Sequence, residues 1–159
     1  GLGDVYKRQA LFTGLHLKDS EGKNDTLPSI NGIIAYYPPT DVLHLKDDPT
    51  AASKGDENSP EGLLIGKIAV WDAPEKAKEA SPLYYIKDNK DMPPVFLAHG
   101  TKDRVVPFSQ SDLLANELEK NGCEYEFHAL RNADHGSWQF WTQEMLDKVE
   151  AFVLKHLRK

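Results

Sequence analysis

Short apolar runs and amphipathic stretches alternate along most of this chain. Continuous apolar runs in residues 30–37 and 95–98 are short and contain β-branched and aromatic side chains, which favours strands covered on both faces. Residues 124–130 alternate polar with apolar side chains, which predicts a half-exposed edge strand. Amphipathic stretches begin near residues 109 and 137 and predict helices. The order strand, helix, strand, helix predicts right-handed crossovers and a mostly parallel α/β sheet with flanking helices.

The ends of the two predicted helices carry local signals. Ser109 is a plausible N-cap with Asp112 three residues on, and Gly122 is a plausible stop for the same helix. The last helix is expected to begin near Ser137. Its apolar stripe, at steps of three and four residues, is Trp141, Met145, Val149, Phe152 and His156.

The stretch between the first two predicted strands is less regular. Residues 41–72 place prolines and glycines among charges and short apolar patches, which indicates a lid-like insertion that could cover a pocket. A short helix is expected over residues 75–80, because Pro74 suits the first helical turn.

Composition narrows the class of protein. A chain of 159 residues suits one domain or part of one, and 40% hydrophobic with 28% charged residues is typical of globular proteins. The net charge of -6, with no cluster of Lys and Arg, argues against nucleic acid as a partner. No apolar run reaches the roughly 18 residues that a membrane span needs, and no signal-peptide pattern is visible.

The cysteine and histidine content argues against a disulfide and against a metal site. Cys123 is the single cysteine, so no internal disulfide can form and no thiolate zinc site is expected. The six histidines are scattered without the spacing of a helical metal site, so we expect neither a metal nor another cofactor.

Two loops carry the candidate chemistry. Residues 99–107 read His-Gly-Thr-Lys-Asp-Arg-Val-Val-Pro, and residues 132–136 read Asn-Ala-Asp-His-Gly; each follows a predicted strand and precedes a predicted helix. Asp103 and His135 should therefore meet at the carboxyl ends of neighbouring parallel strands, where open α/β sheets build their sites. Without further information, Asp103 could equally fix its own loop, and His135 could be an ordinary loop histidine.

These loops resemble the acid and histidine loops of α/β-hydrolases, in the group of esterases, lipases and prolyl-oligopeptidase-type peptidases. The resemblance implies a Ser-His-Asp triad in which Asp103 orients the imidazole and His135 is the general base. It also implies a structural role for His99, while Asp134 is expected to be a loop carboxylate. Trp138 either lines an acyl or leaving-group pocket or packs with the helix.

The serine of the triad is expected upstream, on a Gly-x-Ser-x-Gly elbow. No such motif occurs in the chain, so we interpret it as the carboxyl-terminal half of a hydrolase, with the amino-terminal strands and the elbow missing. Residues 1–9 resemble a translated sequencing-adapter scar. Residues 10–159 are then the carboxyl-terminal part of one α/β-hydrolase domain.

The resemblance implies a serine hydrolase that acts on a small-molecule carboxylic ester, with this piece inactive alone. A prolyl-oligopeptidase-type peptidase is the alternative enzyme, and a non-catalytic α/β-hydrolase-like binding protein is the alternative outside enzymes. Acyl and alcohol specificity, compartment (cytoplasmic or secreted) and oligomeric state stay open.

Overall fold

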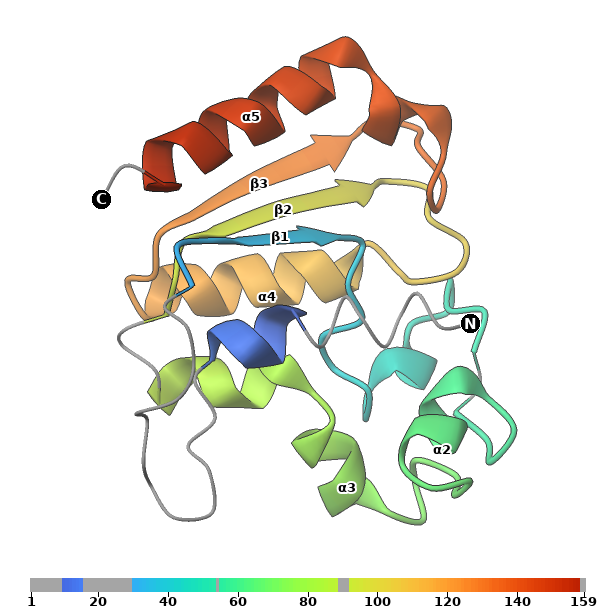
Figure 1. The fold of residues 1–159 in the computed structure, drawn as a ribbon. Coiled ribbons are helices and arrows are strands. Elements are labelled where there is room, and N and C mark those ends of the chain that lie inside the picture. The colour runs from blue at the N-terminus through green and yellow to red at the C-terminus, as the bar shows by residue number, and fades with distance from the viewer. Residues whose placement is uncertain (1–9, 16–29, 54, 89–91, 158–159) are drawn as a thin grey trace.

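The fold is built on a three-stranded parallel sheet. The computed structural model describes residues 10–15, 30–53, 55–88 and 92–157, so the expected scar at residues 1–9 lies outside the described residues. The strands are β1 (Ile33–Tyr36), β2 (Val95–Gly100) and β3 (Tyr125–Leu130), in the order β1-β2-β3. Because all neighbours are parallel, the three strands end at the same edge of the sheet (Figure 1).

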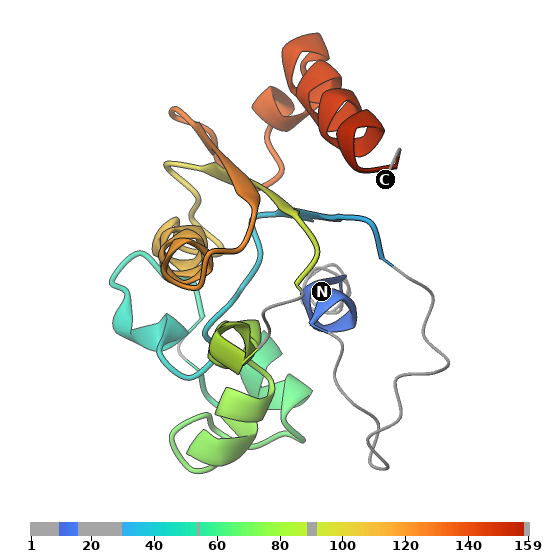
Figure 2. The ribbon, with the colours of Figure 1, turned by 90° about the vertical axis from the view of Figure 1, so that its left-hand side faces the viewer.

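Helices cover both faces of this sheet, as the sequence predicts (Figure 2). On one face lie α4 (Ser109–Lys120), η2 (Pro82–Asp88) and the helical residues 10–14. On the other face lie η3 (Trp138–Trp141) and α5 (Gln143–Leu157). This arrangement confirms the predicted α/β class with a parallel sheet.

The central strand explains why the core has two parts. Every residue of β2 is buried, and its side chains alternate between the faces. Val95 and Leu97 join the cluster under α4, whereas Phe96 and Ala98 join the cluster under α5. The continuous apolar run is therefore the sign of a strand covered on both sides. In β1 the coverage is incomplete, because Ile34 is 40% exposed.

The segment after β1 has a small core of its own. It contains η1 (Leu45–Asp47), α2 (Pro60–Leu64) and α3 (Pro74–Glu79). Four of its side chains form a separate buried cluster: Val42, Ile65, Val70 and Ala77. The short helix expected over 75–80 is present, shifted by one residue.

α4 begins where the sequence predicts, but the predicted N-cap of this helix and the predicted start of the last helix are wrong. Ser109 is the first residue of α4 and not its N-cap; its Oγ donates to Asp48 Oδ2 at 2.5 Å, and Phe108 precedes the helix without a side-chain cap. The stretch from Ser137 does not form one helix, because η3 ends at Trp141 and Thr142 is extended (ψ 153°). Trp141 therefore lies outside the stripe of α5 and is 58% exposed.

No helix in the described part of the chain is both long and apolar enough to cross a membrane.

Candidate active site

The loop after β2 holds the first candidate residue, Asp103. The loop turns through a hydrogen bond from Asp103 N to Gly100 O at 3.2 Å. The Asp103 side chain is fully buried, and its Oδ1 accepts the N–H groups of Val105 (2.8 Å) and Val106 (2.9 Å). One carboxylate oxygen thus fixes the loop, as the simpler interpretation of this residue requires, and the other oxygen is turned toward His135.

His135 lies against that second oxygen. Its Nδ1 is 2.8 Å from Asp103 Oδ2, so the contact expected from the strand order is present. Because an ionised carboxylate only accepts hydrogen bonds, Nδ1 carries the proton, and in the neutral ring the lone pair is on Nε2. The imidazole side chain is 21% exposed, and the Tyr37 ring packs on it with 4.1 Å between ring centroids.

His99 also contacts the Asp103 carboxylate. Its fully buried ring places Nε2 3.0 Å from Val106 O and 3.4 Å from Asp103 Oδ2, and Nδ1 2.7 Å from Ser111 Oγ. Both neighbours of Nε2 are acceptors, so Nε2 carries the proton and Nδ1 accepts from the Ser111 hydroxyl. His99 therefore bonds within the acid loop and α4, as the sequence analysis expects.

These contacts determine the charge of Asp103. Burial by itself would raise the pKa of the carboxyl group, because it disfavours the ionised form. The hydrogen bonds from His135, His99 and the two backbone N–H groups outweigh burial and hold the pKa of Asp103 well below its usual range. The carboxylate is thus ionised at neutral pH.

The two loops approach each other closely through their backbones. Thr101 N donates to Leu130 O and Lys102 N donates to Ala133 O, each at 3.0 Å. A Cβ on Gly100 would lie 2.4 Å from Ala133 O, so glycine is required where the loops pass. The pairing of β2 with β3 continues in this way into the loops and brings Asp103 to His135.

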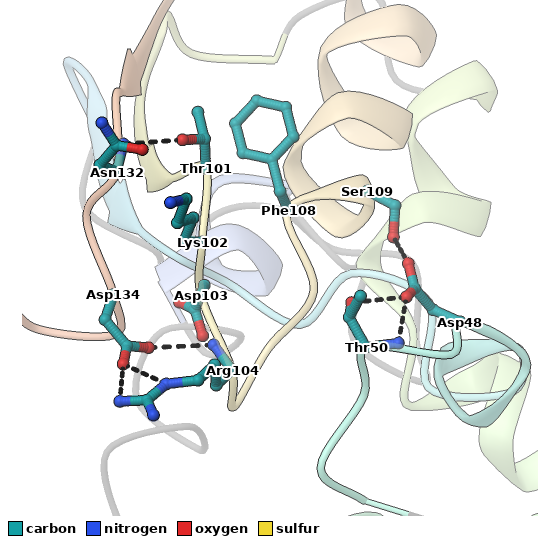
Figure 3. Close-up of a pocket in the computed structure, with 10 residues that line it drawn as sticks. All are labelled: Asp48, Thr50, Thr101, Lys102, Asp103, Arg104, Phe108, Ser109, Asn132 and Asp134. Carbon is teal, nitrogen blue, oxygen red and sulfur yellow. Dashed lines mark hydrogen bonds and ion pairs between the residues drawn. The ribbon is translucent and has the colours of Figure 1, made fainter.

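Asp134 joins the same two loops. Its carboxylate forms an ion pair with Arg104 (Figure 3). The same carboxylate accepts the N–H of His135 at 2.8 Å. The prediction that Asp134 is a loop carboxylate is confirmed. Its pairing with Arg104 has no signal in the sequence, because it depends on how the side chains of the two loops meet.

An open hollow of about 710 Å³ lies beside the acid loop (Figure 3). Its walls come from the acid loop, the histidine loop, the start of α4 and the segment after β1. The lining residues are Asp48, Thr50, Thr101, Lys102, Asp103, Arg104, Phe108, Ser109, Asn132 and Asp134. Two residues of the expected lid-like insertion, Asp48 and Thr50, thus contribute a wall; that the insertion covers a substrate pocket stays a prediction.

Trp138 is placed away from this hollow. It lies in η3, is 72% exposed, and lines a different hollow of about 280 Å³ together with Met145 and Lys148. The strong exposure argues against close packing with the helix, and a contact between Trp138 and substrate stays a prediction. Tyr37, which the sequence analysis did not select, is the aromatic residue in contact with His135. Its position directly after β1 is the signal that could have placed it at this edge of the sheet.

Within the described ranges, no group of three or more His, Cys, Asp or Glu side chains has the arrangement of a metal site.

Comparison with known proteins identifies the family. The sequence pattern of the BD-FAE family matches residues 7–118, which is more than half of the chain. The chain belongs to the BD-FAE family. The match includes Asp103 and ends before His135.

Solved structures share the fold of this BD-FAE family member. A truncated carbohydrate esterase from gut microbiota superposes with a TM-score of 0.83 at 24% identity, over 96% of this chain and 57% of that one. The esterase Est2 of Thermogutta terrifontis gives 0.65 at 22% identity, over 94% of this chain and 51% of that one. Pyrococcus horikoshii acylaminoacyl peptidase superposes with a TM-score of 0.62 at 20% identity, over 94% of this chain and 23% of the peptidase. The described fold is therefore a partial α/β-hydrolase fold, and the chain spans less than two thirds of each of these proteins.

A local sequence match extends to a very large protein. The non-reducing polyketide synthase mapC of Penicillium roqueforti (strain FM164) is 34% identical over 59 residues, which are 37% of this BD-FAE family member and 2% of the synthase.

Proposed function

We propose that this chain supplies the general base and the orienting acid of a serine hydrolase that cleaves carboxylic esters. The observation that supports this most directly is the 2.8 Å contact between His135 Nδ1 and the buried, ionised carboxylate of Asp103. A serine hydroxyl is a weak nucleophile until a base takes its proton, and a carboxylate on the far ring nitrogen holds the base in the right tautomer.

In this mechanism, His135 Nε2 accepts the proton of the attacking serine and later gives it to the leaving alcohol. Asp103 stays ionised throughout and stabilises the imidazolium that forms between these steps. The buried His99 and the two backbone N–H groups keep the Asp103 carboxylate in place while the charge on the ring changes.

The serine and the oxyanion donors must come from elsewhere in the parent protein. The 159 residues contain no Gly-x-Ser-x-Gly motif, and loss of even one oxyanion donor lowers the rate on the order of 100-fold to 1000-fold. We therefore expect no triad-type hydrolysis from this chain alone. Esters are the first substrate class to test, and peptide amides are the second, because fold relatives carry both names.

The test is to complete the hydrolase. Residues 10–159 are joined to the upstream half, with its Gly-x-Ser-x-Gly elbow, of a BD-FAE family hydrolase, and release of nitrophenol from nitrophenyl acetate is followed. We expect turnover from the joined protein and only background from the chain alone. His135→Ala should lower kcat by at least about 1000-fold, since no other positioned base would deprotonate the serine.

Asp103→Asn and a remote variant complete the design. Asp103→Asn should lower kcat on the order of 10³-fold to 10⁴-fold, because the amide favours the wrong tautomer of His135. Glu144→Ala, which removes an exposed partner of Lys148 on α5, should leave kcat unchanged. Fast turnover that survives in the His135→Ala protein would show that His135 is not the base, and cleavage of peptide amides in preference to esters would favour the peptidase alternative.

A further inference from the structure

The Asp134 carboxylate bonds to the backbone of His135 and to the backbone of Arg104, the residue after Asp103. Its Oδ1 accepts the backbone N–H of Arg104 at 3.0 Å and the backbone N–H of His135 at 2.8 Å. Its Oδ2 accepts Arg104 Nε at 2.6 Å and also pairs with Nη2 (Figure 3). Since Arg104 directly follows Asp103, one carboxylate oxygen holds the backbone on both sides of the Asp103–His135 contact.

The carboxylate itself is anchored and charged. Asp134 N donates to Ser137 Oγ at 3.1 Å, and Asp134 O accepts Ser137 Oγ–H at 2.8 Å. The hydrogen bond from the Arg104 side chain, followed by the backbone N–H groups of Arg104 and His135, lowers the pKa of Asp134. At neutral pH the residue is therefore an anion whose backbone is fixed by the turn at Ser137.

We propose that Asp134 is a positioning residue, which sets the separation of Asp103 and His135 through its Oδ1 and not through its ion pair. This inference rests on the proposed function, because it assigns a role beside the same two residues. The Arg104 side chain is 85% exposed, and ion pairs of that kind contribute little in water. The two N–H bonds to one oxygen act directly on the backbone that carries the two functional side chains.

This difference makes the roles of the two Asp134 oxygens separable by substitution. Asp134→Ala removes both N–H acceptors, and Asp134→Glu keeps the charge but moves the oxygens by one methylene group. Asp134→Asn keeps an oxygen that can accept both N–H groups, and Arg104→Ala removes only the exposed ion pair. We expect the first two substitutions to loosen the Asp103–His135 contact and the last two largely to preserve it.

The first readout is spectroscopic and uses the 159-residue chain itself. In protein with ¹⁵N-labelled histidine, the Nδ1–H proton of His135 should be observable, because a proton held in a hydrogen bond exchanges slowly with water. Asp134→Ala and Asp134→Glu should remove or strongly broaden this signal, whereas Asp134→Asn and Arg104→Ala should retain it. Glu144→Ala, which breaks another carboxylate ion pair, is the matched control and should leave the signal unchanged.

The second readout is kinetic, in the joined hydrolase described above. Asp134→Ala and Asp134→Glu should lower kcat about 10-fold to 100-fold with KM nearly unchanged, as displacement of a catalytic group does. Asp134→Asn should recover most of the lost kcat. Thermal unfolding of each variant identifies a loss of stability, which by itself would not remove the Nδ1–H signal of a folded protein.

The outcomes separate the two proposals. A retained Nδ1–H signal in Asp134→Glu, or an Arg104→Ala protein as impaired as Asp134→Glu, would overturn the positioning role. If Asp134→Ala does not fold, Asp134→Glu decides the question, since it keeps the charge and the pairing with Arg104. Full hydrolysis by the His135→Ala protein would instead refute the proposed function. The Nδ1–H signal of His135 in the Asp134 variants would still test the positioning role of Asp134.

Discussion

At the residue scale, Asp103 illustrates how a carboxyl group can be both buried and ionised. Its side chain is completely removed from water, which alone would favour the neutral form. Two backbone N–H groups and two imidazoles supply the hydrogen bonds that water would otherwise make. The same bonds that lower its pKa also fix the direction of Oδ2 toward His135, so charge and geometry have a common cause.

A second carboxylate, that of Asp41 in the segment after β1, affects a tyrosine of η2. Asp41 is buried, and each of its two carboxylate oxygens is 3.3 Å from Tyr84 Oη. Burial, and then the charge and hydrogen bonding of Asp41, raise the pKa of Tyr84 to about 12. We expect one tyrosine of the folded chain to ionise near pH 12 in a spectrophotometric titration, and Tyr84→Phe should delete that step.

Asp41→Asn tests the cause, because it removes the negative charge but keeps a hydrogen-bonding side chain. The step assigned to Tyr84 should then move to lower pH. A step that stays in place would mean that burial alone sets the pKa. Tyr85→Phe, which loses a bond to Glu79 O, is the neighbouring control and should leave the step near pH 12.

A contact between residues can be predicted from the sequence where the positions of the two residues relative to the strands determine it. Asp103 and His135 could be paired from the order of strands and the family resemblance, and the 2.8 Å contact agrees, although their catalytic roles stay predictions. The packing of Tyr37 on His135 could not be predicted, since the sequence indicates neither the positive φ of 42° at Tyr37 nor the direction of its ring. The bonds of Asp134 to Arg104 depend on how two loops far apart in sequence meet.

At the element scale, local signals compete with tertiary contacts. Ser109 has the residue type of an N-cap, but its hydroxyl bonds to Asp48, a residue 61 positions away that the sequence pattern cannot associate with it. Thr142 is the opposite case. Its Oγ1 accepts Met145 N at 3.3 Å and its backbone is extended, so it caps α5, and the signal was present in the sequence but hidden by the apolar stripe that continues through it.

Gln110 joins α4 to the segment after β1 through buried hydrogen bonds. Its Oε1 accepts Thr40 N at 2.9 Å and Asp41 N at 2.8 Å. Gln110→Ala should lower the free energy of unfolding by about 1–3 kcal/mol for each N–H left without a partner. Urea unfolding followed by circular dichroism measures this change.

An exposed glutamine provides the comparison. Gln143→Ala, at the start of α5, removes a surface bond to Asp147 and should change the free energy of unfolding by less than about 0.5 kcal/mol. Equal effects of the two alanine substitutions would contradict the role assigned to the buried amide.

At the scale of the whole molecule, the parallel sheet determines where the site lies. Apolar runs and amphipathic stretches were enough to predict three parallel strands with helices on both faces, because each pattern reflects burial of that element. The same patterns could not place residues 41–72, since their small cluster around Val42 and Val70 forms from residues without a regular period. The hollow beside the acid loop depends on that placement through Asp48 and Thr50.

The whole molecule also has a common response to acid. Hydrogen bonds and ion pairs lower the pKa of several carboxyl groups, among them Asp48, Asp103, Asp134 and Glu144. A group whose pKa is lower in the folded state stabilises it above the unfolded pKa, near 4, and this contribution is lost as pH falls toward the folded pKa. The chain should therefore lose stability progressively below about pH 4.

Salt distinguishes which carboxyl groups dominate this acid response. The ion pairs of Asp134 and Glu144 include well-exposed partners, so about 1 M NaCl should screen them, whereas the fully buried contacts of Asp103 are screened much less. The free energy of unfolding is measured with urea between about pH 5 and pH 2, a range that spans the unfolded pKa near 4. We expect it to keep most of its pH dependence at about 1 M NaCl. Asp103→Asn should flatten that dependence, because the neutral amide binds no proton in either state, while Glu144→Gln should leave it nearly unchanged. A pH dependence that disappears in salt, or that survives in Asp103→Asn, would place the acid sensitivity on the surface and not in the buried contact with His135.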